Sequence, residues 1–126
     1  MMLRAFLRDK RATSAIEFAV TAPVFFAMIF GIIEGGLLMW TQAGLQHGAE
    51  MAARCASINP TLCNSASSIQ DYAVQQAYGL NPPPATFTFG AVACGNQVSA
   101  SYTFRYLTAY FPAATMALRA QSCFPS

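Results

Sequence analysis

The sequence has little charge and few of the side chains that enzymes use for acid–base chemistry. Only 10% of its 126 residues are charged, and it has a single histidine, His47. The nearest acid, Glu50, lies one helical turn from His47, and we expect it to be only a surface partner. No phosphate-binding glycine loop occurs in the sequence. We therefore expect no enzymatic activity and no cofactor.

Positive charge is scarce beyond the N-terminus. The net charge of +2 comes from Arg4, Arg8, Lys10 and Arg11, and the rest of the chain is close to neutral. A nucleic-acid-binding domain carries a basic patch or stripe. The sequence therefore predicts no nucleic-acid partner.

Proline is absent between Pro23 and Pro60, and no cluster of turn residues occurs before Asn59. Apolar residues make up 55% of the chain, which is typical of a membrane protein rather than of a soluble domain. These patterns predict a basic leader at residues 1–12 and one long helix at residues 13–56.

The first part of this helix is long and apolar enough to span a membrane. Residues 18–33 carry no charge, and after Glu34 the apolar run resumes and ends at Trp40. As a helix, residues 18–40 extend over about 33 Å, against about 30 Å for the hydrocarbon core. Trp40 then lies where an interfacial aromatic residue is expected. The alternative is a buried helix of a soluble domain, but so short a chain could not cover this helix on all sides.

The basic leader predicts the orientation of the span. Four cations and one acid, Asp9, precede the span, and few cations follow it closely. The positive-inside rule then places the N-terminus in the cytoplasm. We therefore expect a single-pass protein of the inner (cytoplasmic) membrane, with the residues after Trp40 in the periplasm, another extracytoplasmic compartment or a pilus.

Residues 57–126 predict a small exported domain. A second helix is expected from about Ser65 to Tyr78, since serines can cap its start and Gly79 can end it. Its buried face comprises Ile69, Tyr72, Ala73 and Ala77.

Alternating apolar and polar residues predict strands at residues 86–89 and 98–106, joined by a hairpin turn at Cys94-Gly95-Asn96. A short third strand is expected around residues 116–120 and can pair with the second. The fold class is therefore α+β. A long N-terminal membrane-spanning helix continues into a small exported domain with a second helix and a short antiparallel sheet.

All four cysteines, Cys55, Cys63, Cys94 and Cys123, follow the span. An even number of cysteines outside the cytosol favours disulfides. A metal site is disfavoured because the sequence has no C-x-x-C motif and because His47 lies away from any cysteine pair. The alternative to two disulfides is that one pair is free and buried, since cysteine often acts as a small apolar residue.

The order of the predicted elements favours one pairing. Cys55 ends the long helix and Cys63 precedes the second, so a short loop can bring their Cα atoms within the range of about 4.4–6.8 Å that a disulfide requires. A third strand antiparallel to the second would bring Cys123 to the edge where Cys94 lies. We therefore predict the disulfides Cys55–Cys63 and Cys94–Cys123.

Small residues recur at every fourth position of the apolar segment. This row lets another membrane helix approach closely, although glycine and proline are in any case commoner in membrane helices. We expect it to be a helix-packing face. It consists of Ala19, Pro23, Ala27, Gly31 and Gly35.

Two glutamates interrupt the apolar segment. A carboxylate in lipid is costly without a partner, so Glu17 is a functional candidate. Glu34 either meets a polar partner within a helix assembly or reaches water near the interface. A basic leader, small residues, Glu17-Phe18 and a long apolar helix together resemble the class 3 signal of type IV pilins. In those signals a prepilin peptidase cuts after a glycine, and glutamate is the fifth residue of the mature chain. The resemblance implies cleavage between Ala12 and Thr13, with alanine in the place of the usual glycine.

Further stretches resemble one branch of these proteins. AIEFAVTAPV at residues 15–24, GIIEGG at residues 31–36, AEMAAR at residues 49–54 and the closing residues 111–118 look like TadE-like minor pilins of tight-adherence (Tad) pilus systems. The resemblance implies a pilin-like fold and a minor pilin or pseudopilin that assembles or initiates a Tad-type adhesion pilus. It also implies an assembly role for Glu17. The implied partners are membrane lipid, the prepilin peptidase, a related minor pilin, the major pilin and an inner-membrane assembly platform.

Two other functions stay open. A single-span anchored protein with an exported interaction domain would not enter a filament and would keep its N-terminal leader. A secreted binding domain released by ordinary signal peptidase would begin beyond the apolar block. A cleaved minor pilin would begin at Thr13, so the mass of the mature protein distinguishes the three.

Overall fold

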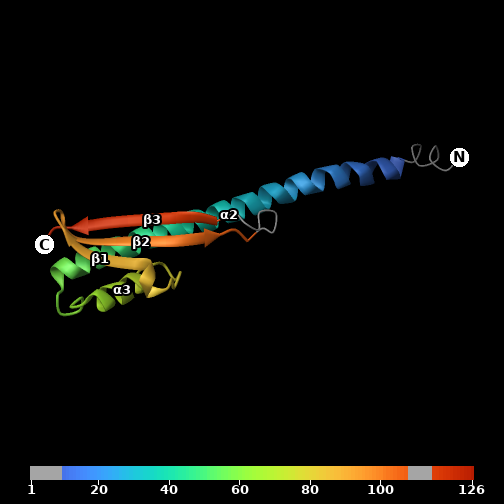
Figure 1. Ribbon diagram of the computed structural model, residues 1–126. Coiled ribbons are helices and arrows are strands. Elements are labelled where there is room, and N and C mark those ends of the chain that lie inside the picture. The colour runs from blue at the N-terminus through green and yellow to red at the C-terminus, as the bar shows by residue number, and fades with distance from the viewer. Residues whose placement is uncertain (1–9, 108–114) are drawn as a thin grey trace. The chain divides into compact units, whose positions relative to one another are not determined.

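The computed structural model describes residues 10–107 and 115–126. Its fold is α+β, as predicted, with a long apolar helix, a short second helix and a three-stranded antiparallel sheet (Figure 1). The elements are α2 (Lys10–Ile58), α3 (Ala66–Gln75), the 3-10 turn η1 (Pro84–Thr86), β1 (Phe87–Val92), β2 (Gly95–Arg105) and β3 (Thr115–Phe124). The chain divides into two compact units, Met1–Gly35 and Gly36–Ser126.

The helix α2 is slightly longer than predicted. It begins at Lys10, inside the predicted leader 1–12, the first nine residues of which lie outside the described part of the chain. It ends at Ile58 because Asn59 precedes Pro60, and a residue before proline disfavours helical backbone. The boundary between the compact units falls within α2, so its residues 36–58 belong to the same unit as the sheet.

In this second unit, α2 presents small side chains to the sheet. Leu45, Ala49, Ala52 and Ala53 are completely buried. Alanine side chains add little bulk, so the strands pack close to the helix axis. Phe87 of β1, together with Val98 of β2, fills the space left between them, and both are completely buried.

The second helix, α3, begins as predicted and ends earlier. Ser65 caps it, since the Ser65 hydroxyl accepts a bond from the Ser68 amide and the Ser68 hydroxyl accepts one from the Ser65 amide. The helix ends at Gln75 rather than at Tyr78, because the backbone at Tyr78 and Gly79 is left-handed, with φ of 50° and 75°. Ile69 and Ala73 are buried as expected.

The three strands lie in the order β1-β2-β3, all antiparallel. The hairpin turn is displaced from its predicted place: Val92 pairs with Gly95, so the turn residues are Ala93 and Cys94. Gly95 is in the strand with φ of 123°, and a Cβ there would contact the carbonyl oxygen of Phe124 and lie 2.8 Å from the Cα of Pro125. The third strand is longer than residues 116–120, because pairing with β2 continues to Phe124.

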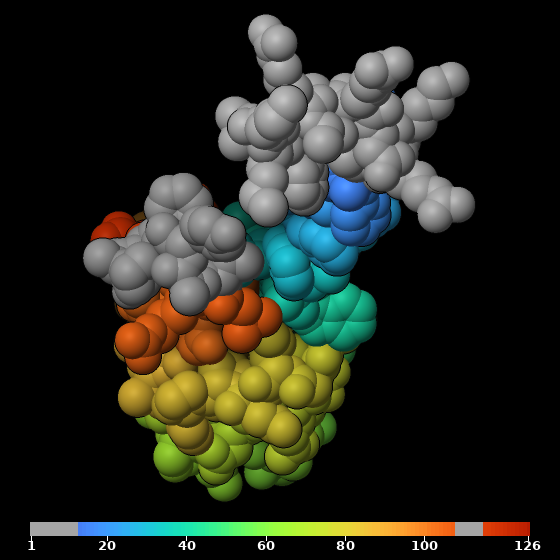
Figure 2. All heavy atoms as spheres, turned by 90° about the vertical axis from the view of Figure 1, so that its right-hand side faces the viewer, coloured from blue at the N-terminus to red at the C-terminus, as the bar shows by residue number. Residues whose placement is uncertain are grey.

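Both outer strands of the sheet have backbone carbonyls bound by glutamine side chains. On β3, Gln42 and Gln46 of α2 donate to the carbonyls of Arg119 and Gln121 at 2.9 and 3.3 Å. On β1, Gln70 of α3 donates to the carbonyl of Phe87 at 2.8 Å. These bonds hold the sheet to both helices and occupy carbonyls that an added strand would need. Figure 2 shows the segment after α3, with the strands β1 and β2, as one continuous packed surface in yellow to orange.

Two glycines of α2 allow α3 and the segment after it to approach. A Cβ at Gly48 would lie 2.7 Å from the carbonyl oxygen of Ala73 and 3.1 Å from the ring of Phe87. A Cβ at Gly44 would lie 2.9 Å from the carbonyl oxygen of Ala77. A Cβ atom does not approach a carbonyl oxygen this closely, so both positions require glycine.

We expect Gly48→Ala to destabilise the protein, although alanine favours a helix over glycine by about 1 kcal/mol. The added methyl group meets a backbone carbonyl that cannot move freely, and such overpacking costs about 1–3 kcal/mol. Gly36→Ala is the matched control, since nothing lies within 4 Å of its added methyl group. Thermal unfolding followed by circular dichroism in detergent measures both. A melting temperature of Gly48→Ala equal to that of Gly36→Ala would contradict the packing described.

Candidate functional site

The first part of α2 exposes a continuous apolar surface. Residues 18–33 carry no charge, and none of the most apolar stretch of the helix is buried against the other described residues. Exposing an apolar surface of this size to water is unfavourable, whereas contact with lipid or with other apolar helices is not. One N-terminal helix of the described chain is thus long and apolar enough to cross a membrane, which is consistent with single-pass anchoring. Its largest exposed side chains include Ile16, Phe18, Val20, Phe25, Met28 and Ile32.

The polar side chains within this segment differ in whether their own helix provides a hydrogen-bond partner. The hydroxyl of Thr21 donates to the carbonyl of Glu17 at 2.8 Å, so this hydroxyl is satisfied by its own helix. The side chain of Glu17 is exposed. Inside an α-helix the backbone N–H groups are already hydrogen-bonded, so the backbone offers no donor to the Glu17 carboxylate. In lipid this carboxylate therefore requires a hydrogen-bond donor or a cation from another group. Glu34, the other acid of the segment, is half-buried.

All five small residues of the predicted packing face are exposed, and a Cβ at Gly31 or Gly35 would meet nothing within 4 Å. Each step of four residues advances about 40° around an α-helix, so the row from Ala19 to Gly35 winds through about 160°. A single partner helix therefore contacts two or three neighbouring members, such as Ala27, Gly31 and Gly35. The row is open for a second chain along its whole length.

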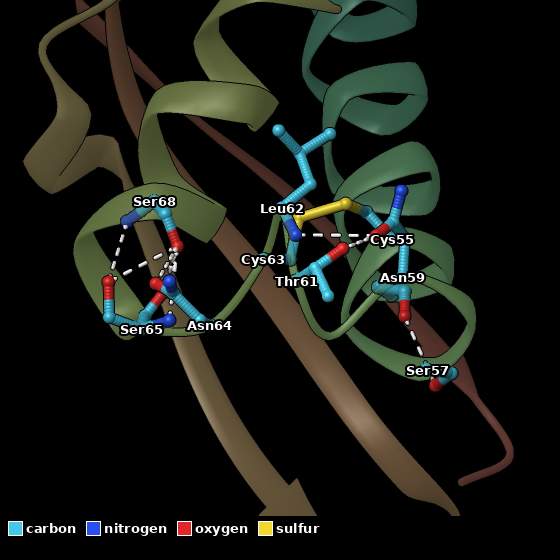
Figure 3. The surroundings of a disulfide bond; sticks show 10 residues. Cys55, Ser57, Asn59, Thr61, Leu62, Cys63, Asn64, Ser65 and Ser68 are labelled. Atoms are coloured by element: carbon cyan, nitrogen blue, oxygen red, sulfur yellow. Dashed lines mark hydrogen bonds between the residues drawn. A yellow bond between two sulfur atoms is a disulfide. The ribbon is translucent and has the colours of Figure 1, made fainter.

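The first disulfide joins Cys55 to Cys63, as the sequence analysis predicts, with Cα atoms 5.9 Å apart. The turn between them is built around Asn59, whose side-chain oxygen accepts bonds from the hydroxyl of Thr61 and the amide of Leu62 at 2.7 and 3.3 Å (Figure 3). Both half-cystines are buried. The bridge fixes the end of α2 beside the start of α3.

The second disulfide joins Cys94 to Cys123, also the predicted pair, with Cα atoms 6.3 Å apart. It connects the β1–β2 turn to the end of β3. Ser57 of α2 lies at the same place, since its hydroxyl accepts a bond from the Asn96 side chain at 2.9 Å and lies 3.4 Å from the carbonyl oxygen of Phe124. Both covalent bridges therefore lie at the end of the unit where α2 ends.

One further hollow lies on the surface of the described residues. A hollow of about 410 Å³ on the sheet is open and lined by hydroxyls, small residues and one cation, Arg119. Within residues 10–107 and 115–126, no group of three or more histidine, cysteine or acidic side chains is placed to hold a metal ion.

Three features of the site were missed from the sequence. The edge-binding glutamines look like ordinary surface residues of a helix, and Gly44 and Gly48 look like a continuation of the small residues in the span. The sequence pattern predicts Tyr78 as the end of a helix, whereas its ring stacks on His47 with centroids 4.6 Å apart. The Tyr78-Gly79 pair at the end of the helical pattern is the sequence signal that could have indicated an earlier end of the helix.

Comparison with known protein families finds a match in the long helix. The family model described as TadE-like protein matches residues 12–54. The match begins at Ala12, the residue before the predicted cut, and ends one residue before Cys55, so it covers most of α2 and none of the sheet. The resemblance found in the sequence is confirmed over this stretch. No curated protein and no solved structure matches the chain.

The two disulfides should contribute differently to stability. In the chain-entropy model, closing loops with sequence separations of 8 and 29 residues is worth about 2.5 and about 3.5 kcal/mol. We therefore expect the double variant Cys94→Ser/Cys123→Ser to lose more free energy of unfolding than Cys55→Ser/Cys63→Ser, and to lose hydrogen-exchange protection at the end of β3. Urea unfolding of both variants in detergent provides the measurement. A larger loss on removing the short loop would refute the expected order.

Proposed function

We propose that this chain, whose α2 matches the TadE-like protein family over residues 12–54, is a minor pilin or pseudopilin that takes part in the assembly or initiation of a Tad-type adhesion pilus. The observation that carries the proposal is the exposed apolar helix with a carboxylate, Glu17, near its start. A folded unit with a core of its own follows the same helix. Such a subunit holds its helix among other helices and presents its folded unit outside them.

The proposed location is the inner membrane, with the N-terminus in the cytoplasm. The basic leader supports this orientation through the positive-inside rule. The two disulfides also support it, because they form and persist in oxidising compartments such as the periplasm. The part of the folded unit Gly36–Ser126 that follows Trp40 is then extracytoplasmic.

In the proposed mechanism, the prepilin peptidase first cuts between Ala12 and Thr13 on the cytoplasmic side. Cleavage removes the basic leader and creates a new α-amine on Thr13. The carboxylate of Glu17 on one subunit then meets the α-amine of a neighbour, and the pair relieves the cost of placing each charge in lipid. Charge pairing thereby sets the axial position of one helix against the next.

The proposed partners follow from the same helix. A related minor pilin and the major pilin would pack against the small-residue row, in which Gly31 and Gly35 leave room for close approach. The inner-membrane assembly platform would receive the subunit from the lipid. The unit Gly36–Ser126 remains outside the helix assembly and is available to other proteins.

A second candidate is a single-span anchored protein with an exported interaction domain that never enters a filament. One observation favours it: alanine stands at position 12, where class 3 signals usually have glycine. An anchored protein of this kind keeps its leader and needs no partner for a new α-amine. The state of the N-terminus separates the two candidates.

Processing should depend on the size of residue 12. In cells with the prepilin peptidase, the mature protein should begin at Thr13, Ala12→Gly should be cleaved at least as completely, and Ala12→Leu should accumulate with its leader. Intact mass spectrometry of the purified proteins gives the N-terminus directly. A wild-type protein that keeps residues 1–12, or an Ala12→Leu variant that matures normally, would show that the assigned processing site is wrong.

Assembly should depend on the charge of Glu17. Breaking a buried charge pair costs about 3–5 kcal/mol, and every 1.4 kcal/mol is about tenfold in an equilibrium. We therefore expect Glu17→Gln to reduce pili per cell by at least about tenfold, with membrane insertion and both disulfides unchanged. Glu50→Gln, a neutralisation on the exposed surface of the folded unit, is the control and should pilate normally. Normal pilus counts in Glu17→Gln would exclude the proposed role.

A further inference from the structure

An aromatic cluster, defined as Trp40, His47 and Tyr78, joins α2 to the loop after α3. Trp40 and His47 lie seven residues apart, about two turns, on one side of α2. The ring of Tyr78 stacks on His47 with an interplanar angle of 6°, and its centroid lies 6.2 Å from that of Trp40. Tyr78, which is distant in sequence, thus contacts both Trp40 and His47 of the long helix.

The backbone at Tyr78 is held in a conformation that bulky residues rarely adopt. Its φ is 50°, and Gly79 and Asn81 follow with φ of 75° and 44°. Sparsely populated backbone at such a residue costs about 1–3 kcal/mol and persists only where the surroundings hold it. Here the stack on His47 and the burial of Ala77 hold it. The stack on His47 thus keeps a large aromatic side chain on the surface of α2 despite the unfavourable backbone.

The cluster is exposed although it is largely apolar. The side chains of Trp40 and Tyr78 remain 58% and 51% exposed. Leu37 and Met39, beside Trp40 on α2, are also exposed. No charged residue occurs between positions 36 and 49 or between positions 75 and 104. The surface is therefore neutral and apolar, with the polar tips of indole and phenol at its edge.

The apolar run that begins in the first compact unit ends in sequence at Trp40. Trp40 and Tyr78 both belong to the second unit, where their ring contact makes them one exposed aromatic surface. Tryptophan and tyrosine are favoured at the membrane–water interface because each combines an apolar ring with a polar tip. The continuity with the apolar run and the neutrality of the cluster select lipid headgroups over a charged protein partner.

We propose that Trp40 and Tyr78 form an aromatic belt that lies in the headgroup region of the membrane and holds the exported unit against its surface. The proposal rests on the membrane-spanning part of the proposed function. His47 lies about 10 Å further along the helix than Trp40, on the water side, where it stacks on Tyr78 and fixes its ring. Before assembly, the belt keeps the subunit at a defined depth in the bilayer.

The experiment uses the fact that Trp40 is the only tryptophan. In the full-length chain, Trp40→Phe combined with Tyr78→Trp moves the fluorophore to position 78. The proteins are reconstituted into phosphatidylcholine vesicles in which a fraction of the lipid carries a nitroxide on its headgroup. We expect quenching at position 78 to reach at least about half of that for Trp40 in the unsubstituted protein.

A matched control places the fluorophore away from the membrane. Trp40→Phe combined with Ile58→Trp puts it at the end of α2, eighteen residues and about 27 Å from position 40, at a site that is 60% exposed. This variant should show no quenching by the headgroup nitroxide. Non-reducing gels confirm that each variant keeps both disulfides.

The outcomes separate this proposal from the one it rests on. Quenching of Trp40 without quenching at position 78 would overturn the belt and leave the membrane span standing. A Trp40 that no lipid quenches, in a protein that does not remain with the vesicles, would overturn both. If Tyr78→Trp does not fold, NMR of the unsubstituted chain in nanodiscs decides: gadolinium-chelate headgroups should broaden the amide signal of Tyr78 and leave that of Ile58 sharp, and a sharp Tyr78 signal would overturn the belt.

Discussion

The folded unit depends on the near absence of side-chain bulk along one stretch of α2. From Gly44 to Ala53 the buried positions are glycine and alanine with one leucine, so α3 approaches the helix on one side and the sheet on another. Larger side chains would separate these layers and expose the rings of Phe87 and Phe104. The same small residues give α2 little apolar area of its own, and the larger side chains of the core, among them Phe87, Val98, Phe104 and Leu118, come from the sheet.

The two parts of α2 differ in which sides are apolar, and each part suits different surroundings. From Phe18 to Ile33 the helix carries no charge, and none of its most apolar stretch is buried against the other described residues. After Gly36 it is one-sided, with glutamines and His47 toward the edges and small residues toward the core. The family match ends near the point where α2 ends, so the shared sequence describes the helix and not the particular sheet built on it.

The sequence was sufficient for features that depend on local patterns. The long helix follows from an apolar run without proline, the capped start of α3 from Ser65 and Ser68, and the strands from alternation around Phe87 and Val98. The disulfide pairs followed from element order, because short connections leave few ways to place four cysteines. Features set by contacts between distant segments were not predictable. The turn moved to Ala93-Cys94 because Gly95 has to pass close to the end of β3, and α3 ended early because Tyr78 stacks on α2.

The placement of the two disulfides and the edge glutamines has a mechanical consequence. The end of α2, the β1–β2 turn and the end of β3 are tied together by the bridges and by Ser57. Gln42 and Gln46 bind β3 further back along the same helix. Suppose that a force along the axis of α2 is applied at its Trp40 end while the sheet is held in place. The contacts between α2 and the sheet are then loaded in shear. Contacts loaded in shear share the force and break together, whereas contacts that unzip break one at a time, so the folded unit resists tension applied along α2.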